Sequence, residues 1–279
     1  MSPDSQASEA LPSRRRRSPR GGRHRGEESF LLPPGSPAMV LAVPRHATAP
    51  NSIATDLARL VETEQTGQPV FLGYLDGNES HLATVLAGLR QQRDDEPAAV
   101  VVPMITGPDA DTEAAIRKMV ADAPVPAVAA GPLGPHPLIA EALHDRLAEA
   151  GLARADRVRM MTMVTGASGV IVVTPGDHEA VRQAEVTSVL LASRLAAPVF
   201  TASLSDHAAL SAAGEQLRAS GAQRLAISPH LIGPETTPDH IAAAAAAAGA
   251  EFAAPLGPHP ALAQVAALRY VEALANALA

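Results

Sequence analysis

The sequence contains no cysteine and no tryptophan, and only 2% of its 279 residues are aromatic. Without cysteine, the chain can form no disulfide, no thiolate metal site and no cysteine nucleophile. Because aromatic rings are so scarce, Ala, Val, Leu and Ile must fill the core, which suits parallel sheets covered by alanine-rich helices. An apolar content of 47% over this length is enough for two modest domains.

Long apolar runs are also missing, since none reaches the roughly 18 residues that cross a membrane. The segment from Ile241 to Ala248 is alanine after its first residue and is typical of a helix. Near the N-terminus, residues 30–32 are apolar but too few for a secretory signal before the two prolines that follow. We therefore expect a cytoplasmic protein with no membrane association.

The formal net charge of −7 is unevenly distributed. Residues 1–37 carry seven arginines against four acidic side chains, so the remainder is strongly acidic. An acidic body binds nucleic acid poorly, and the arginine run has no interleaved aromatic rings for stacking on bases. We expect residues 1–37 to be a solvated, disordered tail and expect no nucleic-acid binding.

The chain repeats itself. The hexapeptide Pro-Leu-Gly-Pro-His-Pro occurs at residues 132–137 and again at 255–260. Each copy follows an apolar strand that runs into Gly-Pro-acid, and each half also contains Pro-Val-Phe, at residues 69–71 and 198–200. The apolar run at 39–43 aligns with the one at 169–173. Matched features in the same order indicate a tandem duplication.

Short apolar runs alternate with helical patterns in each half. In the first half the predicted strands are 40–43, 70–72, 99–102 and 127–130, and the predicted helices are 52–64, 81–93, 111–121 and 138–150. This alternation indicates right-handed βαβ units and a parallel sheet. We predict an α/β fold of two duplicated domains with a cleft between them. The predicted boundaries are a tail at 1–37 and domains at 38–155 and 156–279.

Histidine and carboxylate side chains recur where the predicted strands end. These candidate residues are His46, Asp109, Asp111, His230 and Glu235. In parallel sheets ligands bind at the carboxyl ends of the strands, and neutral imidazole with carboxylate suits a divalent first-row metal. The sequence has no glycine-rich phosphate loop and no Gly-x-Ser-x-Gly elbow, so we expect neither a nucleotide nor a serine hydrolase.

The segment Leu133–Leu143, which reads Leu-Gly-Pro-His-Pro-Leu-Ile-Ala-Glu-Ala-Leu, resembles the sirohydrochlorin and cobalt chelatase family. Residues 256–263 give a second copy, and the resemblance covers roughly residues 38–279. It implies a duplicated chelatase architecture and a lyase that inserts Fe²⁺ or Co²⁺ into a tetrapyrrole, in siroheme or cobalamin biosynthesis. The metal would be a substrate.

Two catalytic motifs of this family are altered here. Family members follow the first strand with Ala-His-Gly-Ser, whereas this chain has Pro44-Arg45-His46-Ala47, so Arg45 occupies the histidine position and His46 comes one residue later. The second family histidine falls in a loop that reads Gly107-Pro108-Asp109 here, with carboxylates and no imidazole.

The resemblance nevertheless implies a role for each candidate. His46 and His230 would be catalytic, because a histidine can serve as ligand or base near pH ~6.5. Substrate carboxylates call for arginine or backbone N–H groups, which implies Arg45, Gly107 and Gly233 as substrate-binding residues. The metal ligands would be His46, His230, Asp109, Asp111 and Glu235.

Other interpretations stay open at this point. The chain could be a degenerate chelatase that binds a tetrapyrrole or metal, or that partners an active paralogue, without catalysis. It could also be an adaptor whose basic tail recruits partners. For Asp109 and Glu235 helix capping is the competing role, and for His136 and His259, which lie between prolines, it is capping and packing. The sequence gives neither the metal nor the macrocycle, and it leaves open whether the chain forms a homodimer.

Overall fold

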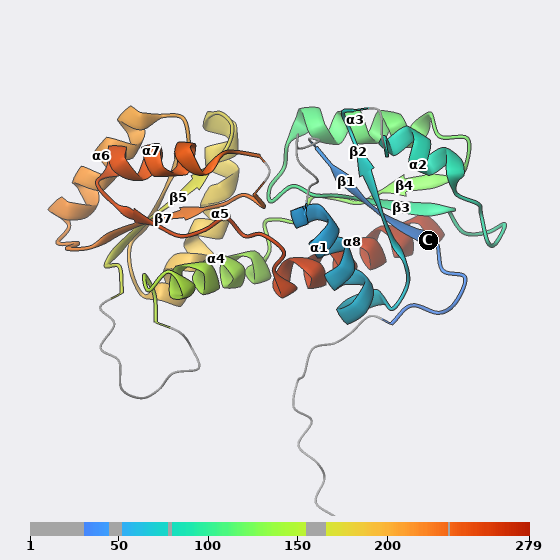
Figure 1. Cartoon of the computed structure of the whole chain (residues 1–279), viewed down its shortest axis with the longest axis horizontal. Helices are drawn as coiled ribbons and strands as arrows, with labels where there is room; N and C mark the ends of the chain where they lie inside the picture. The colour runs from blue at the N-terminus through green and yellow to red at the C-terminus, as the bar shows by residue number, and fades with distance from the viewer. Residues whose placement is uncertain (1–30, 45–51, 78–79, 155–165, 234) are drawn as a thin grey trace, which may run out of the picture.

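The computed structural model describes residues 31–44, 52–77, 80–154, 166–233 and 235–279. These residues form two four-stranded parallel sheets, ordered β2-β1-β3-β4 and β6-β5-β7-β8. Helices cover both faces of each sheet, and the two domains lie end to end (Figure 1). The predicted α/β fold with a duplicated domain is therefore confirmed.

The N-terminal half has four strands and four α-helices, with one π-helical turn. Its strands are β1 (Ala38–Val43), β2 (Val70–Tyr74), β3 (Ala99–Pro103) and β4 (Ala127–Ala129). Its helices are α1 (Ser52–Leu60), continued by η1 (Val61–Thr66), then α2 (Leu82–Gly88), α3 (Ala110–Ala121) and α4 (Pro137–Glu149).

The C-terminal half repeats this order. Its strands are β5 (Gly169–Thr174), β6 (Val199–Ser203), β7 (Leu225–Pro229) and β8 (Glu251–Phe252). Its helices are α5 (His178–Leu195), α6 (His207–Ala219), α7 (Pro238–Ala248) and α8 (Pro260–Leu278). The central strands β3, β5 and β7 are buried along their whole length, as expected of parallel strands covered on both faces.

The strand pairing corrects the alignment of the two halves by one residue. Ala38 pairs with Ala99, and Gly169 pairs with Leu225, so Ala38 of β1 corresponds to Gly169 of β5. The sequence comparison aligned residue 39 with residue 169. Two apolar runs of similar composition can be aligned in more than one register, and the sequence alone does not show which register is right. The hydrogen-bonded ladder removes that freedom.

Helix α2 is shorter than predicted. The pattern favoured a helix over 81–93, but α2 ends at Gly88, and Leu89 has extended backbone angles. Glycine lowers helix propensity by about 1 kcal/mol relative to alanine, and only Leu82 and Leu86 of α2 are buried. The prediction for residues 89–93 is therefore wrong.

The last helix of each half packs against the other half. Helix α4 lies against α5 and β7, whereas α8 lies against α1, η1, β3 and β4. Figure 1 shows this exchange by colour, with green α4 beneath the C-terminal sheet and red α8 beneath the N-terminal sheet. One arginine on each helix fixes the crossing. Arg146 donates to the carbonyl oxygen of Leu256, through Nε at 2.9 Å and Nη2 at 2.7 Å.

Arg269 of α8 repeats this contact in the other direction. Its Nε donates to the carbonyl oxygen of Pro132 at 2.8 Å, and its Nη2 donates to that of Leu133 at 3.3 Å. Each arginine therefore holds the Pro-Leu-Gly-Pro-His-Pro loop of the opposite repeat.

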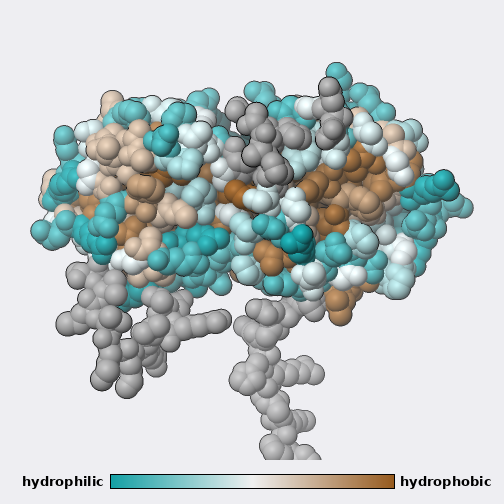
Figure 2. Space-filling model, in the orientation of Figure 1, coloured by the Kyte–Doolittle hydropathy of each residue, from teal (hydrophilic) through white to brown (hydrophobic). Residues whose placement is uncertain are grey.

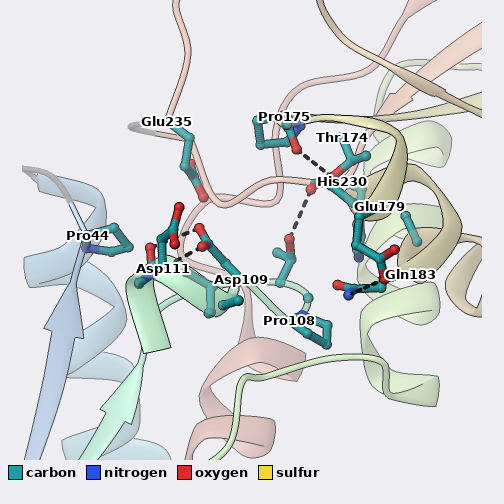
Figure 3. A pocket seen from close by; sticks show the side chains of 18 of the residues that line it. Pro44, Pro108, Asp109, Asp111, Thr174, Pro175, Glu179, Gln183, His230 and Glu235 are labelled. Carbon is teal, nitrogen blue, oxygen red and sulfur yellow. Dashed lines mark hydrogen bonds between the residues drawn. The ribbon is translucent and has the colours of Figure 1, made fainter. Parts of the chain in front are cut away.

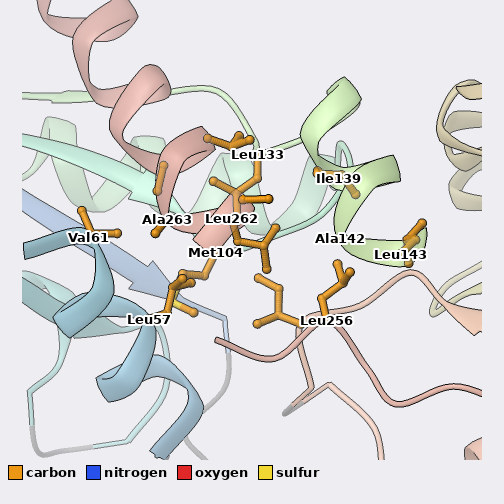
Figure 4. Packing of buried hydrophobic residues seen from close by; sticks show 14 of the residues in the cluster. Leu57, Val61, Met104, Leu133, Ile139, Ala142, Leu143, Leu256, Leu262 and Ala263 are labelled. Atoms are coloured by element: carbon orange, nitrogen blue, oxygen red, sulfur yellow. The ribbon is translucent and has the colours of Figure 1, made fainter. Parts of the chain in front are cut away.

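A single apolar cluster runs through both halves because of this exchange. Figure 4 shows Leu57 and Met104 of the N-terminal half packed with Leu143 of α4 and Leu262 of α8, beside Leu256. The cluster also contains Val172 of β5. The two domains therefore share the core on this face of their sheets, which fixes the walls of the space between them, while the opposite face of each sheet has a cluster of its own.

Two predictions concern segments outside the described residues. The predicted domain boundary at 155/156 falls in residues 155–165, and most of the predicted tail falls in residues 1–30. Both stay predictions.

Among the described helices, none is long and apolar enough to cross a bilayer. On the face drawn in Figure 2, apolar colour gathers over the N-terminal domain around edge strand β2, where Phe71 is 40% exposed.

Candidate functional site

A cleft of about 640 Å³ opens between the two domains, at the carboxyl ends of β1, β3, β5 and β7. This is where ligands bind in parallel α/β sheets. The N-terminal wall comes from the ends of β1 and β3 and the start of α3. The C-terminal wall comes from the end of β5, the start of α5 and the loop after β7. The polar and charged side chains that line it are Thr106, Asp109, Asp111, Thr112, Thr174, Asp177, Glu179, Gln183, His230 and Glu235.

Asp109 and Asp111 lie at the start of α3. Asp109 caps the helix, since its Oδ1 accepts from the backbone N–H of Thr112 at 3.1 Å and its Oδ2 accepts from the Thr112 hydroxyl at 2.9 Å. Asp111 is exposed in the first helical turn, where a carboxylate complements the helix dipole. Asp109 thus has the capping role that the sequence allowed for, and it also lines the cleft.

Glu235 follows β7 and folds back on its own loop. Its Oε1 accepts from the backbone N–H of Ile232 at 2.9 Å, and its Oε2 accepts from that of Gly233 at 2.6 Å. Burial raises the pKa of this carboxyl, and the backbone hydrogen bonds offset part of that rise. In Figure 3, Glu235 lies with Asp109 and Asp111 on the Pro44 side of the cleft, and His230 and Gln183 lie toward α5.

His230 is held at the seam between the domains. Its backbone N–H donates to Val173 of β5 at 2.7 Å, and its carbonyl oxygen accepts from the hydroxyl of Thr106 in the other domain at 3.0 Å. Its side chain is only 2% exposed, and neither ring nitrogen has a hydrogen-bond partner among the described residues. Burial lowers the pKa of this imidazole to about 4, so the ring is neutral at pH 7.

The start of α5 supplies site residues that the sequence analysis did not select. Asp177 caps the helix, accepting from the backbone N–H of Glu179 at 2.9 Å. Glu179 accepts from the Gln183 amide at 3.0 Å and pairs with Arg182. No sequence motif singled out Gln183, because it lies a full turn and a half inside a helix.

The two histidines of the repeated hexapeptide are helix caps. His136 Nδ1 accepts from the backbone N–H of Leu138, and His259 Nδ1 accepts from that of Ala261, both at 3.2 Å. Burial, assisted by a nearby arginine, lowers the pKa of each imidazole. Neither residue lines the cleft. The most recognisable motif of the sequence is therefore structural, as the competing interpretation expected.

The predicted site residues fall into three groups. Asp109, Asp111, His230, Glu235 and Gly107 all line the cleft. Gly233 is not part of the lining. It has φ of +148°, and a Cβ there would lie 2.6 Å from Cδ1 of Ile53, so glycine is required where this loop meets α1.

Arg45 and His46 lie outside the described residues, directly after Pro44, which lines the cleft. Among the residues that are described, no three His, Asp or Glu side chains are grouped so that they could hold a metal ion.

Comparison with known proteins supports the chelatase resemblance. Residues 45–150 match the CbiX family model. No curated protein matches the chain significantly. The solved structures with a similar fold include sirohydrochlorin chelatase SirB from Bacillus subtilis subspecies spizizenii in complex with cobalt. It shares 14% identity over 86% of this chain and 96% of its own, with a TM-score of 0.60.

Two further structures agree. SirB from Bacillus subtilis with Fe³⁺ is 15% identical over 86% of this chain and 96% of its own, with a TM-score of 0.58. CbiX, the terminal enzyme for siroheme biosynthesis in denitrifying bacteria, is 16% identical over 85% of this chain and 99% of its own, with a TM-score of 0.56. The N-terminal domain of this chain is thus similar to the CbiX family, and the chain as a whole has the two-domain fold seen in these sirohydrochlorin chelatase structures.

Proposed function

We propose that this protein is a sirohydrochlorin-type chelatase that inserts Fe²⁺ or Co²⁺ into a tetrapyrrole. The observation that carries the proposal is the cleft itself, which lies at the strand ends between two domains of the chelatase fold and is lined by carboxylates and one imidazole. Related structures were solved with cobalt and with Fe³⁺, which supports a metal of this kind as the substrate. No nucleotide is required for the reaction.

We assign metal binding to the Pro44 side of the cleft. Asp109, Asp111 and Glu235 lie there, and His46 follows Pro44 by two residues in the chain. Imidazole with carboxylate oxygens binds a divalent metal without forming a closed cage of four strong ligands, so the metal can be handed on. The hydrogen bonds of Asp109 and Glu235 to backbone N–H groups weaken these carboxylates further as ligands.

We assign to His230 the acceptance of the protons that leave the pyrrole nitrogens. Metal insertion breaks two pyrrole N–H bonds, each nitrogen keeps its electron pair for the metal, and two protons must be accepted. A neutral imidazole with free ring nitrogens is suited to take them one at a time. We assign His230 this role rather than that of a metal ligand because it lies away from Asp109, Asp111 and Glu235, on the side of the cleft where Glu179 lies.

The macrocycle carries carboxylates, and binding them is assigned to Arg45 and to the Gly107 loop, because Gly233 does not line the cleft and its backbone N–H already donates to Glu235. Arginine recognises a carboxylate with two parallel hydrogen bonds. A side chain is absent at Gly107, so a flat ring can approach the backbone and His230 behind it.

The test is anaerobic absorbance spectroscopy of the purified protein with sirohydrochlorin and Fe²⁺ or Co²⁺. We expect conversion to the metallated macrocycle faster than the uncatalysed reaction. We also expect the rate to fall by about 10²-fold or more in a His46→Ala, His230→Ala double variant. His207→Ala, which alters an exposed histidine at the start of α6, is the matched control and should keep the wild-type rate.

A second function is favoured by one observation, namely that the described residues include no three-ligand metal cluster. A chain that binds the macrocycle without inserting metal would be a carrier or a partner of an active paralogue. Macrocycle binding would be monitored by fluorescence quenching. Binding together with metal insertion at the uncatalysed rate would establish this alternative and overturn the first.

A further inference from the structure

The C-terminal domain has a polar layer on the face of its sheet that α4 and α5 cover, at the end nearest the cleft. Side chains alternate along a strand, so Thr174 lies on the same face as Val172, and Ser228 and His230 lie on the same face as Ala226. From α5 this layer receives Gln183, Thr187 and Ser188, and from β6 it receives Thr201. Thr174, Gln183 and His230 open onto the cleft.

The same layer is apolar in the N-terminal domain. With the corrected register, Thr174 corresponds to Val43, Thr201 to Leu72, Ser228 to Val102 and His230 to Met104. Val43, Val102 and Met104 are buried in the main apolar cluster, and Leu72 packs against it. The fold therefore accepts apolar side chains at all four positions, so packing alone does not require polar ones.

The polar side chains of this layer are incompletely satisfied. Buried atoms without a hydrogen-bond partner among the described residues include both ring nitrogens of His230, the hydroxyls of Ser228 and Thr187, and Oε1 of Gln183. A buried polar group left without a partner costs about 1–3 kcal/mol, and in native proteins such groups are commonly bound by ordered water. His230 and Gln183 line the cleft, and unsatisfied groups at its wall fit ordered water there.

The layer continues beyond these residues. Ser188 of α5 is hydrogen-bonded to Thr201 of β6 at 2.7 Å, and Thr201 is half-buried at the edge of the domain. Hydroxyl groups therefore extend from the cleft floor, at His230, along the inner face of α5 to the side of the domain where β6 is the edge strand.

We propose that this layer is a hydrated proton route, in which His230 receives a proton from the cleft and Ser228, Thr187 and intervening water carry a proton onward past Ser188 and Thr201. This inference rests on the proposed function for the source of the proton. A pyrrole N–H bond breaks and its electron pair stays on the pyrrole nitrogen. The free ring nitrogen of His230 takes the proton while its other N–H passes one to the adjoining water or hydroxyl. The ring is again neutral, as the other tautomer.

The first test needs no catalytic activity. In protein labelled with ¹⁵N-histidine, exchange of the His230 ring N–H with water is measured by NMR, and a His230→Met variant assigns the resonance. We expect fast exchange in the wild type although the ring is 2% exposed. In a Thr187→Val, Ser228→Ala variant we expect exchange to slow by about tenfold or more. Ser193→Ala, an exposed serine on α5, is the control and should change nothing.

The second test follows metal insertion in the same variants. The double variant should lower kcat by about tenfold with unchanged KM for metal and macrocycle, because it touches neither substrate. Equal N–H exchange in wild type and double variant would overturn the route, whatever the insertion rate. If the wild type inserts no metal but exchange behaves as expected, the route stands and the proposed function fails.

Discussion

His230 differs from His136 and His259 in how its environment affects protonation and hydrogen bonding of the imidazole ring. Its neighbours supply no charge that would stabilise the imidazolium, and burial alone lowers its pKa to about 4. Burial also lowers the pKa of His136 and of His259, but the Nδ1 of each accepts a hydrogen bond from a backbone N–H. Only for His230, among these three, are both ring nitrogens buried without a hydrogen-bond partner among the described residues.

This difference predicts a specific dependence of stability on pH. An unfolded histidine titrates near 6.5 and folded His230 near 4, so above about pH 6.5 His230 contributes no pH dependence. As the pH falls below that value, His230 is protonated in the unfolded chain but not in the folded chain. The free energy of unfolding therefore decreases until about pH 4. At pH 4.5 the loss should reach about 2–3 kcal/mol.

The measurement is the free energy of unfolding in urea at pH 7.5 and pH 4.5, for the wild type and for His230→Met. Methionine is the residue that the N-terminal half has at the equivalent position, Met104, so the variant should fold. It should also lose less stability than the wild type on acidification. An equal loss in both proteins would contradict the buried, neutral state of His230.

At this scale the sequence revealed part of the site. Asp109 and Glu235 could be found because both follow Gly-Pro after a strand, and the structure places both in the cleft wall. Thr187 and Ser228 could not be found, because nothing in a sequence shows that a hydroxyl inside a helix or strand has no partner. Arg45 and His46 stay predictions.

At the scale of elements, the exchanged helices α4 and α8 are the feature with the largest structural effect. Each begins at the last proline of the repeated hexapeptide, and the histidine before that proline caps the helix. The alternation of strands and helices predicted both helices, and α4 begins one residue from the predicted start. Amphipathic periodicity shows which side of a helix is buried but not which sheet buries it, so the exchange could not be predicted.

Removing one clamp should weaken this crossing. In Arg269→Ala the carbonyl oxygens of Pro132 and Leu133 lose their donor, and we expect about 1–3 kcal/mol of destabilisation in urea unfolding. Arg146→Ala should give a similar loss through Leu256. Arg117→Ala, which removes an exposed pair with Glu113, is the control and should cost less than about 0.5 kcal/mol. Equal effects at Arg269 and Arg117 would show that the clamp contributes nothing.

At the scale of the whole molecule, the shared core makes the two sheets interdependent in an unusual order. Helix α8 is last in the chain, yet six of its seven buried residues belong to the apolar cluster that it forms with the first domain. The end of the sequence therefore completes a domain that began more than two hundred residues earlier.

Deleting residues 260–279 should consequently damage the domain that is distant in sequence. We expect hydrogen–deuterium exchange of backbone amides in β1 and β3 to lose protection, because α8 covers that sheet. Amides in β5 and β7, covered on this side by α4 and α5, should stay protected and serve as the internal comparison. Loss confined to the C-terminal sheet would contradict the observed exchange of helices.

The reciprocal clamps also bear on ancestry. A single-repeat ancestor with this fold would have had an uncovered sheet face and a final helix with no sheet of its own to cover. Two such chains would satisfy each other by swapping that helix about a twofold axis, with one arginine holding each loop. The present chain has the arrangement of a swapped dimer joined into one polypeptide. Once joined, the two halves were free to diverge, and they now differ at four equivalent positions, with Met, Val and Leu in one half and His, Ser and Thr in the other.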